Sequence, residues 1–289
     1  MGDDCARIAL APGHELLVTT DMLVEGRHFL PGADPRKLGH KALAVNLSDL
    51  AAGAATPRWI TLALSLPQAD EAWLAAFAEG LFALAERHEV DLVGGDTTRG
   101  SVLTICITAM GETPAGCALS RAGARPGHDI WVSGALGGAA LALMHPEIEG
   151  AARRLHEPQP RVALGERLRG LASAAIDISD GMAGDLGHIL ERSNVGARVN
   201  YESVPKDEGF SRLGEPEVER RCVLSGGDDY ELLFTAAPER RAAVAALGGE
   251  LDLALTRIGA VEAQAGLRIA DANGAPVPFE AGFDHFGGR

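Results

Sequence analysis

Residues 60–90 read "ITLALSLPQADEAWLAAFAEGLFALAERHEV", and this stretch contains the two hydrophobic periodicities that decide the fold class. From 60 to 66, isoleucine and leucine alternate with small or polar residues, which is the period of a strand with one buried face, and Pro67 ends the run. From Glu71 to Val90, large apolar residues recur at helical spacing: Trp73, Phe77, Leu81 and Leu84. The stretch therefore predicts a strand followed by a helix.

The flanking segments of the first half repeat this mixture. We expect a strand over 15–24 and another from Leu103, where Ile105 and Ile107 restore the period of two. A helix is predicted to end before Pro57, from an apolar stripe formed by Leu43, Leu47, Leu50 and Ala54. The first half is therefore mixed α/β.

A polar, glycine-rich connection at 120–129 separates the two halves of the chain. We expect one domain over 1–120 and a second over 121–289. In the second half, strands are expected over 129–134, 173–179 and 230–236. Helices are expected over 161–171, along the face of Met182, Leu186 and Ile189, and over 238–247. The predicted fold class is α/β, in the mixed α+β sense, with two domains.

The composition narrows the class of partner. With 289 residues, 46% of them hydrophobic, the chain can bury a sizeable core. Lys and Arg number 26 against 40 Asp and Glu, and the net charge of -14 has the wrong sign for binding nucleic acid or an anionic membrane. No apolar run approaches the roughly 18 residues of a membrane span, and no signal-like segment opens the chain, so we expect a cytoplasmic protein. The four cysteines lack CxxC spacing, which disfavours a disulfide framework or a zinc site.

Aspartates recur where regular elements are expected to begin or end. Asp21 lies late in a strand, Asp96 follows a glycine pair expected to close a strand, and Asp177 lies near the end of another. Asp228 directly precedes the predicted strand "YELLF", and carboxylates at strand ends can converge on one crevice. Asp49 lies within the apolar segment "ALAVNLSDLAAGAA", where an ionised side chain needs a partner such as a metal ion.

These carboxylates favour a site for Mg²⁺ and a polyphosphate. Mg²⁺ prefers oxygen ligands and commonly combines a few carboxylates with the phosphates of a substrate. The hydroxyls of Thr19, Thr20 and Ser179 are next to these aspartates and can ligate a metal or donate to phosphate oxygens. Gly94 and Gly95 would let backbone amides approach a nucleotide.

Each of these residues also has a structural interpretation, which the sequence leaves open. Asp4 could belong to a solvated terminus, Asp180 could cap a helix, and Asp96 could cap a turn. His28 could be an ordinary surface or core histidine, and Arg121 could be a solvated charge on a loop. Phe283 could be an apolar side chain that closes the core.

Six motifs occur in order along the chain: "GDDCA" (2–6), "TTDMLVEGRHF" (19–29), "KALAVNLSDLAAGAATPRW" (41–59), "GGDTTRG" (94–100), "AIDISDGMAGDLGHI" (175–189) and "SGGDDYELLFT" (225–235). Together they resemble the thiamine-monophosphate kinase family, whose superfamily includes aminoimidazole ribonucleotide synthetase, selenophosphate synthetase and a hydrogenase maturation factor. The resemblance implies a phosphotransferase that makes thiamine diphosphate from thiamine monophosphate and ATP with several Mg²⁺ ions. The transfer would be direct and in line, without a general base, because the acceptor phosphate oxygen is already ionised.

The resemblance also implies roles for individual residues. Metal ions would be bound by Asp4, Thr19, Thr20, Asp21, Asp49, Asp96, Asp177 and Asp180. ATP would contact Gly95, Asp96, Arg121 and Ser179, and thiamine monophosphate would contact His28, Asp228 and Phe283. The fold implied is a homodimer whose N-terminal sheets join into a barrel, with an α/β C-terminal domain alongside.

Two rival functions stay open on the sequence alone. One is another ATP-using enzyme of the same superfamily, with a different acceptor. The other is a sensor that binds nucleotide and metal without turnover. Release of ADP that depends on thiamine monophosphate would separate the kinase from both.

Overall fold

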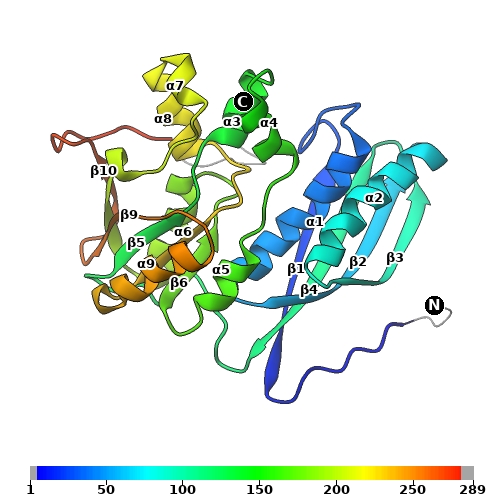
Figure 1. The fold of residues 1–289 in the computed structure, drawn as a ribbon, viewed down its shortest axis with the longest axis horizontal. Helices are drawn as coiled ribbons and strands as arrows, with labels where there is room; N and C mark the ends of the chain where they lie inside the picture. Colours follow the sequence, from blue (N-terminus) through cyan, green and yellow to red (C-terminus); the bar gives the residue numbers. More distant parts are fainter. Residues whose placement is uncertain (1–4, 281–289) are drawn as a thin grey trace. The chain divides into compact units, whose positions relative to one another are not determined.

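A computed structural model describes residues 5–280 of the chain. The residues form two compact units (Figure 1). Unit 1 comprises the chain up to Ala118 together with His156–Val162, and unit 2 comprises Leu119–Leu155 and the chain from Ala163 onward. The two-domain mixed α/β class expected from the sequence is confirmed.

Unit 1 is a four-stranded sheet with two helices on one face (Figure 1). In chain order its elements are β1 (His14–Val24), α1 (Pro35–Ala52), β2 (Thr56–Leu66), α2 (Glu71–Arg87), β3 (Asp91–Arg99) and β4 (Thr104–Pro114). The strand order is β1-β4-β2-β3, with β4 antiparallel to both β1 and β2 and with β3 parallel to β2. Strand β3 is thus an edge strand.

Aspartates determine where both helices of unit 1 begin. The Asp34 carboxylate accepts a hydrogen bond from the Lys37 amide at 3.0 Å and precedes Pro35, which suits the first helical position. The Asp70 carboxylate accepts from the amides of Ala72 and Trp73 at 2.9 and 3.1 Å. These caps satisfy backbone donors that a helix leaves unpaired at its start.

The two faces of the unit 1 sheet differ in exposure. The face toward α1 and α2 is buried and contains Ile60, Leu64, Ile105 and Ile107. On strand β1, the alternate residues Leu16, Val18 and Met22 are 40%, 56% and 55% exposed, so they lie on the opposite face. We call this opposite surface the open face; it presents apolar side chains to solvent.

Unit 2 is built on a six-stranded sheet of order β10-β7-β9-β5-β8-β6. Its strands are β5 (Asp129–Ser133), β6 (Ala172–Asp177), β7 (Gly196–Asn200), β8 (Leu232–Ala236), β9 (Leu255–Glu262) and β10 (Gly266–Ala270). All neighbouring pairs are antiparallel except β10 and β7. The α-helices that begin in unit 2 are α3 (Gly138–Met144), α4 (Glu149–His156), α6 (Met182–Ser193), α7 (Phe210–Leu213), α8 (Pro216–Ser225) and α9 (Arg241–Glu250). Helix α5 (Val162–Arg167) begins at the last residue of the unit 1 segment His156–Val162 and continues into unit 2.

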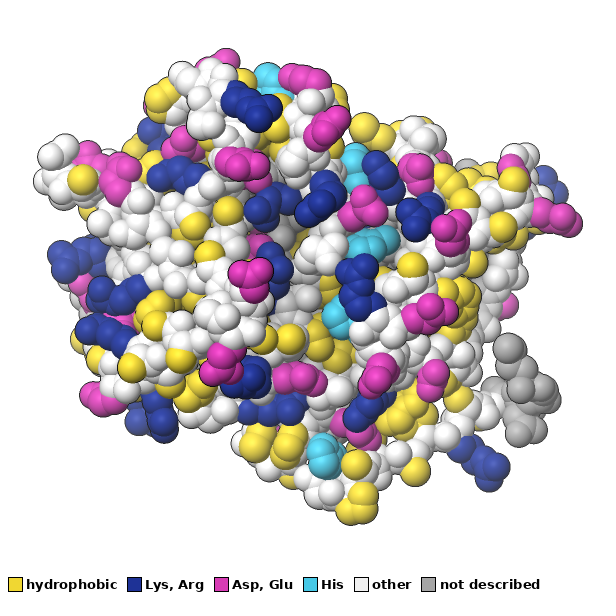
Figure 2. Space-filling view, in the orientation of Figure 1, with side chains coloured by type: hydrophobic (Ala, Val, Ile, Leu, Met, Phe, Trp, Pro, Cys, Tyr) yellow, Lys and Arg dark blue, Asp and Glu magenta, His cyan; other side chains and the backbone are white. Residues whose placement is uncertain are grey.

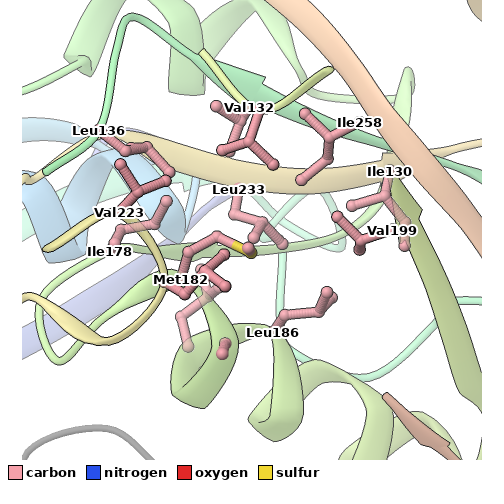
Figure 3. Close-up of a cluster of buried hydrophobic side chains, with 14 of the residues drawn as sticks. Ile130, Val132, Leu136, Ile178, Met182, Leu186, Val199, Val223, Leu233 and Ile258 are labelled. Carbon is pink, nitrogen blue, oxygen red and sulfur yellow. The ribbon is translucent and has the colours of Figure 1, made fainter. Parts of the chain in front are cut away.

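The core of unit 2 packs helix α6 against the sheet. Figure 3 shows Met182 and Leu186 of α6 among side chains from several strands, including Leu233 of β8 and Val199 of β7. Because α6 is held by these contacts, the loop that precedes it is held in place as well. The predicted binding residues Ser179 and Asp180 occupy that loop, and Asp177 ends the strand before it.

Several local predictions need correction. The glycine pair does not close a strand, since β3 continues through Gly94, Gly95 and Asp96 to Arg99. The helix expected over 161–171 is shorter, and the strand expected over 173–179 ends at Asp177. The elements α4, α7, α8, β7, β9 and β10 have no counterpart among the sequence predictions. Within residues 5–280, every helix is too short or too polar to cross a bilayer.

The surface carries charges of both signs. On the face that Figure 2 shows, lysine and arginine side chains are interspersed with aspartate and glutamate. No large patch of one sign stands out on this face.

Candidate functional site

In unit 1, helix α1 and strand β1 bring three of the predicted oxygen ligands together. The Thr19 hydroxyl of β1 donates a hydrogen bond to the Asp49 carboxylate of α1. Asp21 is two residues further along β1, so its side chain lies on the same face as Thr19. The Asp21 amide donates to the side-chain oxygen of Asn46, one turn before Asp49, at 3.2 Å. Asn46 therefore connects the strand to the helix at this cluster.

The sheet separates two other predicted ligands from this cluster. Met22 on the open face pairs with Cys106 of β4, and both Cys106 and Asp96 pair with Ala63 of β2. Because paired residues on neighbouring strands share a face, Asp96 lies on the open face. Thr20 lies there too, and its hydroxyl is 2.9 Å from the hydroxyl of Thr108. Within one chain, Asp96 and Thr20 thus face away from Asp49.

Gly95 and Asp96 lie on the edge strand β3. Gly95 has a φ of +153°, and a Cβ there would lie 2.0 Å from the Leu62 carbonyl oxygen. The exposed Asp96 carboxylate accepts from the Thr97 amide at 2.8 Å. A glycine at 95 is therefore required by packing against β2, whatever else it contacts.

His28 lies in the turn after β1. Its Nδ1 accepts a hydrogen bond from the Val24 amide at 3.0 Å. A ring nitrogen that accepts carries no proton, so the neutral imidazole has its proton on Nε2. This contact holds the half-buried ring at the end of β1.

In unit 2, Asp177 at the end of β6 is followed by Ser179 and Asp180 in the loop between β6 and α6. Asp177 is the last residue of β6 and is 4% exposed. The Asp185 carboxylate reaches back from the first turns of α6 and accepts from the amides of Ser179 and Asp180 at 3.0 and 3.1 Å. Burial of Asp185 raises its pKa to about 7. The alternative that Asp180 caps the helix is wrong, because the N-cap residue is Gly181.

A second loop, residues 226–231, lies beside the first. The Asp228 amide donates to the Ser179 carbonyl at 2.9 Å, and the Tyr230 amide donates to the Ile178 carbonyl at 2.8 Å. The Tyr230 hydroxyl donates to the Asp228 carboxylate at 2.8 Å. Two residues predicted for different ligands, Ser179 and Asp228, are thereby neighbours.

A third loop, residues 134–137 between β5 and α3, is joined to the second loop by the buried Asp229 carboxylate. Both oxygens of Asp229 accept from the Gly137 amide, at 3.0 and 2.9 Å, and burial raises the pKa of Asp229 well above its ordinary value. Asp185, Asp229 and Tyr230 were not selected from the sequence. An acid inside the helix motif "GMAGDLGHI" and a tyrosine inside "GGDDYE" were the only signals available.

Arg121 lines a small hollow in unit 2. The hollow has a volume of about 320 Å³ and is formed by Ser120, Arg121, Ala122, His188, Glu191 and Arg192. The Arg121 carbonyl accepts from the Ser193 hydroxyl at 3.1 Å, which ties this segment to the end of α6. Two guanidinium groups make the hollow suitable for an anionic group.

The predicted residues Asp4 and Phe283 lie outside the described residues. Among residues 5–280, no group of three or more His, Cys, Asp or Glu side chains is placed to hold a metal ion. The donors that do come together, on Thr19, Asp21 and Asp49, are oxygens, which fits the ligand preference of Mg²⁺. A shell completed by substrate phosphates and water needs only one or two carboxylates.

Both halves of the chain match known family models. Residues 2–113 match the N-terminal domain of AIR synthase related proteins, and residues 125–272 match the C-terminal domain of the same proteins. The fold and the loops described above therefore define a member of this class.

Three relatives narrow the class further. The chain is 45% identical over 298 residues to the thiamine-monophosphate kinase of Salmonella typhimurium, covering 99% of this chain and 91% of the relative. It superposes on the crystal structure of thiamine-monophosphate kinase from Stenotrophomonas maltophilia K279a with a TM-score of 0.90 and 47% identity, covering 96% and 90% of the two chains. A third similar structure is AaThiL complexed with AMPPCP and TMP, with a TM-score of 0.83 and 32% identity over 96% and 89% of the chains. The chain belongs to the thiamine-monophosphate kinase family of enzymes.

Proposed function

We propose that this enzyme transfers the γ-phosphoryl group of ATP to the phosphate of thiamine monophosphate. The products are thiamine diphosphate and ADP, and the reaction is a step of thiamine diphosphate biosynthesis. The observation that carries the proposal is the match to thiamine-monophosphate kinases over almost the whole chain, at 45% identity. The AaThiL complex supports it, because AMPPCP is an analogue of ATP.

The oxygen donors of the two units are proposed to hold Mg²⁺. In unit 1 these are Thr19, Thr20, Asp21, Asp49 and Asp96, in unit 2 they are Asp177 and Asp180, and Asp4 completes the set. When bound, Mg²⁺ would neutralise the charge of the phosphate oxygens, which these carboxylates would otherwise repel. Activity is expected to disappear when EDTA removes divalent cations and to return when Mg²⁺ is added in excess.

The remaining proposed contacts divide between the two substrates. ATP is assigned to Gly95, Asp96, Arg121 and Ser179, and thiamine monophosphate to His28, Asp228 and Phe283. The Asp228 carboxylate suits a substrate with a cationic thiazolium ring. No side chain is assigned as a general base, because an ionised phosphate oxygen attacks without losing a proton. Acceleration of the transfer is assigned instead to in-line positioning of the two substrates.

We also propose that the enzyme is a homodimer, with the unit 1 sheets joined into a barrel. The support is the open face, where Leu16, Val18 and Met22 are 40%, 56% and 55% exposed. A second copy of the same face would remove these side chains from water. We assign dimerisation to the N-terminal domain, residues 1–120.

The first test measures ADP release by the purified chain with ATP and Mg²⁺. Thiamine monophosphate, thiamine and no acceptor are compared, and the product is identified by mass. Turnover with thiamine monophosphate alone, yielding thiamine diphosphate, is the expected result. Binding of ATP without ADP release would instead indicate a sensor, and release with another acceptor would indicate a different enzyme of the superfamily.

A second test removes one charge from the unit 1 cluster. Asp49→Asn is expected to abolish turnover while the fold survives, because the amide oxygen can still accept from Thr19. The matched control is Asp34→Asn on the same helix, since asparagine caps a helix about as well as aspartate. Near-normal turnover in Asp49→Asn, with an unchanged Mg²⁺ requirement, would contradict the metal assignment.

A further inference from the structure

The loop 226–231 holds two residues in an unusual backbone conformation. Asp228 has a φ of +66° and Tyr230 a φ of +50°, and neither is a glycine. Such conformations cost free energy and persist only where surrounding contacts impose them. They also concentrate at ligand-binding sites, so the side chains of this loop invite a functional explanation.

The contacts that impose this conformation are hydrogen bonds to neighbouring segments. The amides of Asp228 and Tyr230 donate to the carbonyls of Ser179 and Ile178 at 2.9 and 2.8 Å. Between these two residues, Asp229 accepts from the Gly137 amide through both carboxylate oxygens. The backbone on each side of Asp229 is therefore fixed, which in turn fixes the starting direction of the Asp228 side chain.

The last degree of freedom is the orientation of the Asp228 carboxylate itself. Tyr230 is 8% exposed, so its hydroxyl has a defined position, and this hydroxyl donates to the Asp228 Oδ1 atom at 2.8 Å. A hydrogen bond to an ionised acceptor is among the stronger hydrogen bonds in proteins. The hydroxyl thus selects one orientation of the carboxylate.

We propose that Tyr230 is a positioning residue for thiamine monophosphate, acting through Asp228. Its hydroxyl holds the Asp228 carboxylate in the orientation that contacts the substrate. The inference rests on the proposed function, in which Asp228 contacts thiamine monophosphate, and it predicts a selective effect. Loss of the hydroxyl weakens the binding of thiamine monophosphate and leaves the binding of ATP unchanged.

The test compares the two tyrosines of the chain. Tyr230→Phe removes the hydroxyl and keeps the buried ring. Tyr201→Phe is the matched control, because the Tyr201 hydroxyl also donates to a carboxylate, that of Glu219, at 3.0 Å, and Tyr201 has no role in the proposed site. We expect Tyr230→Phe to raise KM for thiamine monophosphate about tenfold, as loss of a hydrogen bond to a charged group does, with KM for ATP unchanged. Tyr201→Phe is expected to change neither KM.

A double-mutant cycle shows whether Tyr230 acts through Asp228. In Asp228→Asn, which is expected to raise KM for thiamine monophosphate, adding Tyr230→Phe should cause no further rise. If the two effects multiply, or if Tyr230→Phe alone leaves KM unchanged while Asp228→Asn raises it, the inference fails and the proposed function stands. If Asp228→Asn leaves KM unchanged, the substrate assignment and the inference both fail.

Thermal unfolding separates positioning from a purely structural role. Tyr230→Phe and Tyr201→Phe are expected to have similar melting temperatures, because each loses one hydroxyl contact and keeps its ring. A much lower melting temperature for Tyr230→Phe, or a chain that does not fold, would assign the hydroxyl to stability and overturn the proposal.

Discussion

At the scale of single residues, the neighbouring glycines of "GGDTTRG" do different things. Gly95 has a positive φ and lies against the backbone of β2, whereas a Cβ at Gly94 would meet only the Thr61 methyl group, at an ordinary 3.6 Å. The two positions therefore differ in whether they tolerate a side chain, although the two glycines are neighbours in the sequence.

This difference predicts opposite results for two alanine variants. Gly95→Ala is expected to lower the free energy of unfolding by about 2 kcal/mol or more, because the methyl group collides with the Leu62 carbonyl and the φ disfavours any side chain. Gly94→Ala should be close to neutral. Urea unfolding of both variants measures the difference, and equal stability would contradict the packing explanation.

Asp129 is a buried carboxylate whose ionisation matters for stability. It is 1% exposed and accepts from Arg241 at 2.5 and 2.8 Å and from Arg257 at 2.5 Å. Burial alone would raise the pKa of Asp129, but the hydrogen bonds and charges of the two arginines outweigh burial and hold its pKa below the ordinary value. The ionised form is therefore the one that stabilises the fold.

The depressed pKa determines the direction of a pH effect. The stabilisation is present above the unfolded-state pKa of about 3.9 and is lost as pH falls through the lower pKa of the folded state. Asp129→Asn is expected to be less stable than wild type at pH 7, with a gap that narrows in acid. Urea midpoints at pH 7 and pH 3 test this, and a gap independent of pH would refute it.

At the scale of elements, helix α6 organises the loop before it. Its apolar side chains Met182 and Leu186 are packed into the unit 2 core, and Asp185 on the same helix binds the amides of Ser179 and Asp180. The packed helix therefore helps to fix the position of the loop residues proposed to contact ATP and metal.

The prediction at this scale concerns Asp185→Ala. Removal of the carboxylate leaves two amides without their partner, so the free energy of unfolding is expected to fall by about 1–3 kcal/mol and KM for ATP to rise. Asp70→Ala is the matched control, since Asp70 also accepts from two amides at a helix start, where a lost cap costs about 1 kcal/mol. Unfolding curves and KM for ATP are measured for both. An unchanged KM in Asp185→Ala would restrict Asp185 to stability.

At the scale of the whole molecule, a single chain does not explain why the open face of unit 1 exposes apolar side chains. Val18 is 56% exposed on this face, and Leu143 in unit 2 is 64% exposed. If the open face pairs with a second copy, a charge at Val18 should be costly, and a charge at Leu143 should not.

Val18→Lys is therefore expected to shift the enzyme from dimer to monomer, because a lysine pair at a symmetric interface would place like charges in an apolar surface. Leu143→Lys is the control and should leave the mass unchanged. Sedimentation equilibrium measures both. A wild-type chain that sediments as a monomer, or a Val18→Lys variant that stays dimeric, would rule out this interface.

The hydrophobic periods of the strands and helices, which the sequence shows directly, determined the α/β fold class of this protein. Strand β2, helix α2 and the buried face of α6 were predictable because each depends on residues two to four positions apart, and the ordered motifs indicated the family. Only the tertiary structure decided the placement of the site residues. The pairing of Asp96 with Ala63 puts that carboxylate on the open face, away from Asp49, and the hydrogen bonds of Asp229 and Tyr230 join loops from distant parts of the chain. The physical reason is that strand register and loop contacts form between residues distant in sequence, whereas helix and strand periods are local.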